Sequence, residues 1–382
     1  MKIPLAWRQL MHQKGKFIVA LAGIGFADIL IFVQLGFLNA LLDSNTGLPN
    51  RLQADLFVVS RQAQNFGALN TFPRRRLFQA KNLPEVASAE PLYVSVGSWK
   101  NPQTKADASL VVLGFNPAKP AFNLKEVNQN LALIQYPDVL LFDRASNGEY
   151  AEAIAQIAAG KPVTTEFLGR KVTVKGLYQV GSSFIADGSV ITSDQNFLRI
   201  YRERTAGAVS MGLITLKPGN DAPATAAKLR RQLPDDVKVF TRQEFITAER
   251  TFLETSTSIG FVFTFGVVVG FLVGVIIVYQ ILFSNVSEHL PEYATLKAIG
   301  YSNSYLLGVV FQEAIILAVS GFVPGCLLSA GLYKITTNAT GLLLMMTGDR
   351  ILQVLILTIA MCVTSGAIAV QKLKSADPAD VF

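Results

Sequence analysis

Residues 288–300, EHLPEYATLKAIG, are the polar segment best able to contact another protein. Pro291 can occupy the first turn of a helix and Gly300 can end one, so this segment predicts a short helix. Glu292 near its start and Lys297 near its end complement the helix dipole. The chemistry that these residues offer is ionic and apolar contact, with no group placed to make or break a bond.

Leu296 and Ile299 lie three residues apart, so they share one face of the predicted helix. That face could fit into an apolar groove of a partner protein. The alternative is a connecting helix that lies on the membrane surface. The spacing alone leaves both interpretations open.

Groups suited to catalysis or metal binding are scarce in this chain. Its only histidines are His12 and His289, and no cluster has the spacing of metal ligands. The sequence also lacks the G-x-x-x-x-G-K-[ST] phosphate-binding loop. We therefore expect a non-catalytic chain without a cofactor of its own, and any ATP and Mg²⁺ would be bound by another polypeptide.

Two acidic residues, Asp28 and Glu313, lie inside long apolar stretches. Ionisable side chains at such positions are costly and often functional. A proton-driven carrier would use them, but two isolated acids without a paired base make a poor proton relay. For Glu313 we favour a buried group that forms hydrogen bonds between spans, with direct involvement in transport as the alternative.

Glycines recur every four residues in the apolar stretch 259–283, at Gly266, Gly270 and Gly274. This spacing places them on one helix face and permits close approach of a second helix. The sequence leaves open whether that helix belongs to the same subunit or to a second copy.

Four long apolar stretches set the architecture, because about 20 apolar residues suffice to cross a bilayer as a helix. The chain is 51% apolar and 16% charged, with a mean hydropathy of +0.38, which excludes a soluble enzyme, a disordered chain and a disulfide scaffold. The predicted spans are residues 17–42, 259–283, 305–332 and 351–370.

Basic residues crowd the first 16 positions, where Lys2, Arg8, Lys14 and Lys16 occur. The positive-inside bias then predicts cytoplasmic N- and C-termini. The remaining segments become a cytoplasmic lead-in at 1–16, an extracytoplasmic domain at 43–258, a cytoplasmic loop at 284–304, an outer loop at 333–350 and a cytoplasmic tail at 371–382.

The segment 43–258 has an α+β pattern, with alternating strand and helix signals. A strand, helix, strand order occurs near its beginning and again near its end. We expect residues 43–103 and 206–258 to pair as a ferredoxin-like lobe. Residues 104–205, mainly strand and turn, would form an inserted β-rich lobe.

The 288–300 segment resembles the coupling-helix signature E-x-x-x-E-x-x-x-L-K-A-[IL]-G of the MacB/FtsX superfamily of ABC-transporter permeases. The lead-in around Trp7, the FQEA run at 311–314 and the DPADVF tail at 377–382 are also similar to that family. Pro291 and the few basic residues of the loop depart from its pattern. The resemblance implies that the ATPase is contacted by Glu288, Glu292, Leu296, Lys297, Ala298, Ile299 and Gly300.

Within the superfamily, the chain most resembles the DevC-type permeases of cyanobacterial tripartite exporters. This implies a bacterial inner-membrane subunit, functioning as a homodimer with a separate ABC ATPase. The further partners implied are a periplasmic membrane-fusion adaptor and a TolC-like outer-membrane duct. The implied cargo is lipid-like, namely a glycolipid, and the outer domain would have the MacB-like periplasmic fold.

Three other functions stay open at this stage. An FtsX-type transducer would activate a periplasmic hydrolase, although its outer domain is usually much smaller than the 216 residues of 43–258. A lipoprotein-releasing permease and a proton-driven carrier are the others. The net charge of +7 does not indicate nucleic-acid binding, because the outer domain carries +5 of it and the chain is anchored in a membrane.

Overall fold

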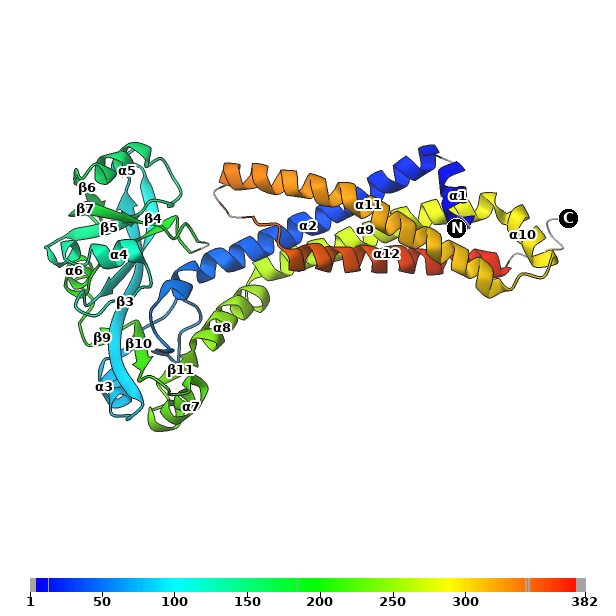
Figure 1. Ribbon diagram of the computed structural model, residues 1–382. Coiled ribbons are helices and arrows are strands. Elements are labelled where there is room, and N and C mark those ends of the chain that lie inside the picture. The colour runs from blue at the N-terminus through cyan, green and yellow to red at the C-terminus, as the bar shows by residue number, and fades with distance from the viewer. Residues whose placement is uncertain (1–4, 13, 184, 341, 343, 376–382) are drawn as a thin grey trace. The chain divides into compact units, whose positions relative to one another are not determined.

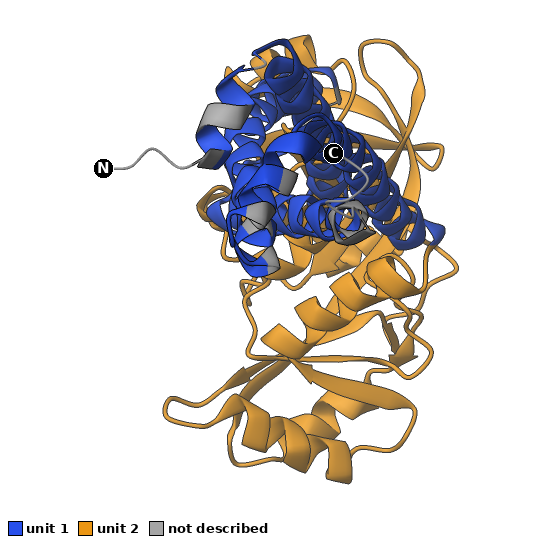
Figure 2. Ribbon diagram, turned by 90° about the vertical axis from the view of Figure 1, so that its right-hand side faces the viewer, with its two compact units in different colours: residues 1–40, 258–382 blue, residues 41–257 orange. Residues whose placement is uncertain are grey.

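The computed structural model describes residues 5–12, 14–183, 185–340, 342 and 344–375 (Figure 1). The chain divides into two compact units (Figure 2). The first, here called the helical unit, comprises Met1–Ala40 and Ser258–Phe382. The second, the sheet domain, comprises Leu41–Thr257.

Helices alone form the described part of the helical unit. They are α1 (Leu5–His12), α2 (Lys14–Arg51), α9 (Ser258–Glu288), α10 (Leu290–Ala298), α11 (Asn303–Thr340) and α12 (Gly348–Ser375). Four helices are long and apolar enough to cross a membrane: Lys14–Arg51, Ser258–Glu288, Leu307–Ala339 and Gly348–Val370. The predicted fold class, one span and then three with a large α+β domain between them, is therefore confirmed in the described residues.

The helices extend beyond the apolar stretches. Helix α11 continues to Thr340 and α12 begins at Gly348, so 11 of the 18 residues of the expected outer loop at 333–350 are helical. Helix α9 likewise includes Glu288, which we expected in the cytoplasmic loop. The helices are longer than the predicted spans because the length of an apolar stretch matches the thickness of the membrane, whereas a helix can continue into polar residues on either side.

The glycine stripe of α9 packs against helices of the same chain. A Cβ added at Gly270 would contact Ile31 of α2, and one at Gly274 would contact Ala27 of α2 and Met361 of α12. Gly266 faces the Gln34 side chain of α2. The stripe is therefore a packing surface within one subunit.

Helices α2 and α11 approach each other even more closely. A Cβ at Gly325 would lie 3.1 Å from the Gly25 Cα and 2.9 Å from the Asp28 Cβ. Small residues permit such backbone contact in membranes, where helix association depends on packing.

The sheet domain contains a nine-stranded sheet in the order β11-β1-β10-β3-β4-β8-β5-β7-β6. Its strands are β1 (Leu56–Ser60), β3 (Val86–Lys100), β4 (Asp107–Phe115), β5 (Val139–Asp143), β6 (Val163–Phe167), β7 (Arg170–Tyr178), β8 (Gly188–Ser193), β10 (Met211–Leu216) and β11 (Val237–Thr241). A separate pair comprises β2 (Phe72–Pro73) and β9 (Ala208–Val209). The helices are α3 (Arg75–Lys81), α4 (Lys125–Gln129), α5 (Ala151–Ala158), α6 (Asp194–Ile200), α7 (Ala222–Gln232) and α8 (Arg242–Thr255), with a 3₁₀ turn at Leu133–Gln135.

Strands β11, β1, β10 and β3 form one antiparallel half of this sheet. Helix α3 connects β1 to β3, and α7 connects β10 to β11. This is the split βαβ topology of ferredoxin-like folds. Strand β1 is buried along its whole length, with Leu56 and Val58 in one apolar core and Phe57 and Val59 in another, because both faces of the sheet are covered.

Strand β3 joins the two lobes, because it is 15 residues long and pairs first with β10 and then with β4. The inserted strands therefore continue the same sheet. The insert is also more helical than we expected, since it contains α4, α5 and α6. Strand β6, which lies at this end of the sheet order, pairs back onto β3 at Trp99 and Phe167 and closes that end of the sheet.

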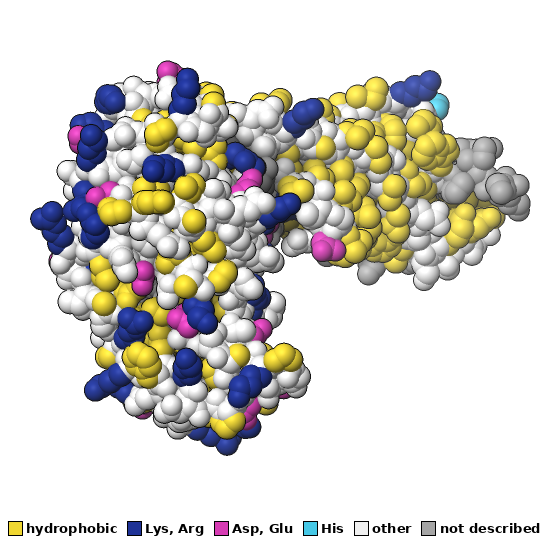
Figure 3. Space-filling model, turned by 60° about the vertical axis from the view of Figure 1, so that its left-hand side comes forward, with side chains coloured by type: hydrophobic (Ala, Val, Ile, Leu, Met, Phe, Trp, Pro, Cys, Tyr) yellow, Lys and Arg dark blue, Asp and Glu magenta, His cyan; other side chains and the backbone are white. Residues whose placement is uncertain are grey.

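The two units differ in the side chains on their surfaces, as expected for a unit in lipid and a domain in water. Hydrophobic side chains cover much of the helical unit in Figure 3, whereas lysine, arginine and acidic side chains are spread over the sheet domain. Exposed residues such as Phe261, Leu272 and Leu327 would contact lipid.

The glycine contact between α2 and α11 generates a first prediction. Gly325→Ala should lower the free energy of unfolding in detergent by about 1–3 kcal/mol, because the added methyl group meets backbone atoms. Gly331→Ala is the matched control, since a Cβ at this position of the same helix meets nothing within 4 Å. Equal thermal stability of the two variants would contradict the proposed contact.

Candidate functional site

Helix α10 is the predicted short helix, and it follows α9 after the single residue His289. Pro291 lies in its first turn. Gly300 has a φ of +108°, and the Tyr301 N–H donates to the Leu296 carbonyl at 3.1 Å. These features form a Schellman cap, which requires a left-handed residue at the position of Gly300.

One face of α10 packs against its own chain. Tyr293 is buried with Val286 of α9, Val310 of α11 and Val370 of α12, and Leu296 contacts the same cluster. Ile299, in contrast, is 72% exposed. The Ile299 N–H still donates to the Thr295 carbonyl at 3.1 Å, so the backbone remains helical up to this residue. The expectation that Leu296 and Ile299 form one docking face is nevertheless wrong, because Leu296 is partly buried against the spans whereas Ile299 is exposed.

The exposed face of this loop carries residues that the sequence did not single out. Tyr301 and Tyr305 are both nearly half exposed, with their ring centroids 4.8 Å apart. Tyrosine is enriched in protein interfaces, because it combines a large apolar surface with a hydroxyl. Together with Ile299 and Glu292, whose side chain is 62% exposed, they form what we call the loop surface.

Glu288 has a role within the chain. Its carboxylate forms an ion pair with Lys16 at the start of α2, and Ser284 contacts both side chains at 3.2 and 3.3 Å. This cluster joins α2 to the end of α9. Glu292 lies 3.1 Å from the His289 Nδ1, whereas the side chains of Lys297 and Ala298 and the 377–382 tail lie outside what the structure describes.

Of the two acids within the spans, only Asp28 has a hydrogen bond among the described residues. Its Oδ1 accepts from the Thr358 hydroxyl at 2.6 Å, which joins α2 to α12. Glu313 is fully buried, and neither of its carboxylate oxygens has a partner in the described part of the chain. The hydrogen bond between spans that we expected at Glu313 is therefore not found among the described residues, whereas Asp28 forms one.

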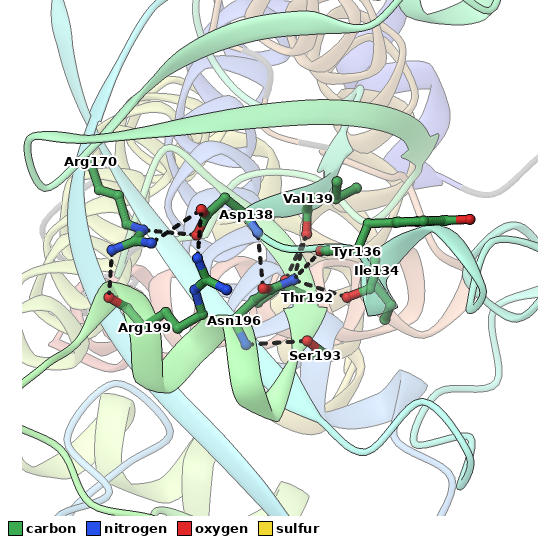
Figure 4. Close-up of polar contacts among 9 residues, drawn as sticks. All are labelled: Ile134, Tyr136, Asp138, Val139, Arg170, Thr192, Ser193, Asn196 and Arg199. Atoms are coloured by element: carbon green, nitrogen blue, oxygen red, sulfur yellow. Dashed lines mark hydrogen bonds and ion pairs between the residues drawn. The ribbon is translucent and has the colours of Figure 1, made fainter.

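In the sheet domain, a network of charged and polar side chains meets at the start of β5 (Figure 4). Arg170 binds Asp138 in a bidentate manner at 2.8 and 3.1 Å, and Arg199 lies 3.2 Å from the same carboxylate. The Arg170 guanidinium holds the pKa of Asp138 below its usual value.

Asn196 of α6 completes this network. Its Oδ1 accepts from the Asp138 N–H at 3.0 Å, and its Nδ2 donates to the Ile134 and Tyr136 carbonyls, both at 2.9 Å. These contacts fix the turn that enters β5, where Asp138 has a φ of +60°. The network thus has a structural role.

Glu249 of α8 is a buried carboxyl that the sequence analysis overlooked. It is 2% exposed and lies between Phe245 and Leu253 on the buried face of the helix, at a spacing that could have identified it. Burial raises its pKa from 4.5 to about 7, against the opposing effect of the Phe66 backbone amide. Helix α8 directly precedes α9 in the sequence.

Groups of three or more potential metal ligands do not occur among the residues that the structure describes. The exposed aromatic, apolar and charged side chains of the loop surface are suited to protein contact. This combination fits a membrane subunit that another protein drives.

Two protein families match the sequence. Residues 17–232 match the MacB-like periplasmic core domain, and residues 264–378 match the FtsX-like permease C-terminal family. The first match spans more than half of the chain. The chain belongs to the MacB/FtsX family of ABC-transporter permeases. Members of this family are membrane subunits that work with ABC ATPase partners.

Two solved structures that are similar to part of this permease are a periplasmic region and an extracellular domain. The periplasmic region of MacB from Actinobacillus actinomycetemcomitans is 12% identical, with a TM-score of 0.35, and the match covers 55% of this chain and 96% of that chain. The extracellular domain of the noncanonic ABC-type transporter YknZ from Gram-positive bacteria is 11% identical, with a TM-score of 0.29 and coverages of 45% and 90%. No curated protein sequence matches the permease.

The family membership identifies the two units of the chain as a periplasmic domain and a set of membrane helices. The sheet domain is the MacB-like periplasmic domain between the first and second membrane helices. The four apolar helices and this domain fit a multi-pass protein of the inner membrane. The permease subunits of such transporters are generally non-catalytic.

The raised pKa of Glu249 generates a second prediction. Between about pH 4.5 and 7 the unfolded chain releases this proton while the folded chain keeps it, so stability falls as the pH rises through this window and then levels off. Glu249→Gln removes that loss. The variant should exceed the parent by about 3 kcal/mol in free energy of unfolding at pH 8 and match it near pH 4.

Thermal or denaturant unfolding of the full chain across this pH range would measure the effect. Glu254→Gln, at an exposed position of the same helix, is the control and should keep the pH dependence of the parent. An unchanged pH dependence in Glu249→Gln would show that Glu249 is ionised in the folded protein.

Proposed function

We propose that this permease couples ATP hydrolysis by a separate ATPase to the export of a glycolipid-like cargo. The cargo would leave through a periplasmic adaptor and a TolC-like outer-membrane duct. Both termini and the α9–α11 loop would lie in the cytoplasm, where the ATPase is. The observation that supports the coupling role most is the loop surface of Glu292, Ile299, Tyr301 and Tyr305, exposed beside a helix whose other face is anchored.

The anchoring determines what a push on α10 would do. Tyr293 and Leu296 pack against the ends of α9, α11 and α12, so these helices would move together with α10. The Lys16–Glu288 ion pair adds α2 to this group. Force applied at the loop surface would therefore reach all four spans.

Covalent connections would carry the motion into the periplasmic domain. Helix α2 continues without a break from Lys14 to Arg51, and α8 precedes α9 with Ser256 and Thr257 between them. The spans would act as levers, and the cargo would be moved by the periplasmic domains. ATP and Mg²⁺ would be bound by the ATPase, which supplies the phosphoryl chemistry.

Resemblance to the DevC-type permeases supports the glycolipid cargo, the adaptor and the duct. The homodimer is proposed on the same ground, with two loop surfaces facing two ATPase subunits. The glycine stripe of α9 does not contribute to that dimer, because Gly266, Gly270 and Gly274 face α2 and α12 of their own chain.

The loop surface generates a third prediction. Glu292→Lys and Tyr301→Ala should each weaken copurification of the ATPase at least tenfold and reduce permease-stimulated ATP hydrolysis, because interface energy concentrates in few side chains. Asp349→Lys, the same kind of charge change at an exposed site next to Arg350, is the control and should keep both activities.

Membrane insertion and thermal stability of the variants should equal those of the parent, because both altered side chains are exposed. If Glu292→Lys and Tyr301→Ala bind the ATPase and stimulate hydrolysis as fully as the parent, the loop surface is not the coupling site.

A further inference from the structure

Strand β11 is the free edge of the nine-stranded sheet. The sheet order ends at β11 and at β6, and β6 pairs back onto β3 through Trp99 and Phe167. Strand β11 pairs with β1 alone among the described strands. An edge strand presents unpaired N–H and C=O groups that can bind another strand.

Two hydrogen bonds establish which groups of β11 face outward. At its ends, the Arg61 N–H donates to the Asp236 carbonyl at 2.8 Å and the Arg242 N–H donates to the Asp55 carbonyl at 3.3 Å. Backbone groups alternate in direction along an antiparallel strand. Val237, Val239 and Thr241 therefore present their backbone groups away from β1.

Neighbouring residues occupy three of these outward groups. The Arg230 Nε donates to the Val239 carbonyl at 2.9 Å, the Thr241 N–H donates to the Glu244 carboxylate at 2.7 Å, and the Val237 N–H contacts the Pro234 carbonyl at 3.4 Å. The Val239 N–H and the Val237 carbonyl still face outward. One donor and one acceptor are thus available to an added strand.

A cavity of about 520 Å³ lies along this edge. Its walls include apolar groups of Leu233, Val239 and Phe240, and charged groups of Arg61, Asp235 and Lys238. The volume is within the range of binding sites for small ligands, about 300–1,000 Å³, and is enough for a few residues of extended chain.

The charges of the cavity are unbalanced. Arg61 pairs with Asp235 at 3.6 Å, and Arg230 pairs with Glu244. Lys238 forms no ion pair with any residue in the described ranges. A ligand with a carboxylate opposite Lys238 would give this lysine an ion-pair partner.

We propose that the free edge of β11 binds an extended, acidic segment of another protein by strand addition. The segment would accept from the Val239 N–H, donate to the Val237 carbonyl and place a carboxylate near Lys238. Main-chain hydrogen bonds give affinity in this mode of recognition, and side-chain pockets give specificity. The proposal does not depend on the export function.

The test uses the full chain in lipid nanodiscs and a short fluorescent peptide of alternating valine or threonine and glutamate. Fluorescence polarisation should show saturable binding. Methylation of alternate backbone nitrogens in the peptide, which removes its strand donors, should weaken binding about tenfold or more. Replacing its glutamates with lysine should have a similar effect.

The chain is varied in parallel. Lys238→Glu should weaken binding about tenfold. Lys171→Glu, the same charge change on β7 beside the opposite end of the sheet, should leave it unchanged. The methylated peptide tests the parent chain directly, so the experiment does not depend on the folding of a variant.

Three results of the peptide measurements would overturn the proposal. They are the absence of saturable binding to the parent chain, equal binding of the methylated peptide, and equal weakening by Lys171→Glu. A Lys238→Cys variant that forms a disulfide-linked dimer and excludes the peptide would also overturn it, because the edge would then pair two copies of this chain.

Discussion

The close packing of α2 against its neighbours is the interaction on which the helical unit depends. Inside a membrane, lipid tails are as apolar as the side chains, so helices associate through shape and through small residues. Gly25 of α2 allows α11 to approach at Gly325, and the glycine stripe of α9 receives Ala27 and Ile31 of α2. Helix α2 is consequently held from two sides, and its continuation to Arg51 makes it the covalent route from the membrane to the periplasmic domain.

Different interactions stabilise the structure at the two ends of α2, because one end lies beside the membrane helices and the other leads into the periplasmic domain. Near the expected cytoplasmic end, the Lys16–Glu288 ion pair and the apolar cluster around Tyr293 hold α10 to the spans. In the periplasmic domain, strand β3 joins the split βαβ half to the insert, and the Asp138 network fixes the entry to β5. The permease thus has an anchored loop in one unit and a sheet with one free edge in the other.

Local signals allowed much of this to be predicted from the sequence. Apolar length identified the four spans, Pro291 and Gly300 delimited α10, and glycine spacing identified the packing face of α9. Contacts between distant residues could not be predicted, because a single sequence does not reveal which residues meet. The ion pair between Glu288 and Lys16, 272 positions away, is one such contact. The packing of Leu296 against the spans, which separates it from the exposed Ile299, also depends on contacts of this kind.

The central claim is that force applied at α10 moves the periplasmic domain. Pulsed electron paramagnetic resonance between spin labels at Lys105 of that domain and Lys334 of α11 tests it most directly, in the complex with the ATPase. The account predicts that the distance distribution shifts when the ATPase is trapped with ATP. An identical distribution with and without ATP, in a complex whose hydrolysis the permease still stimulates, would contradict the account.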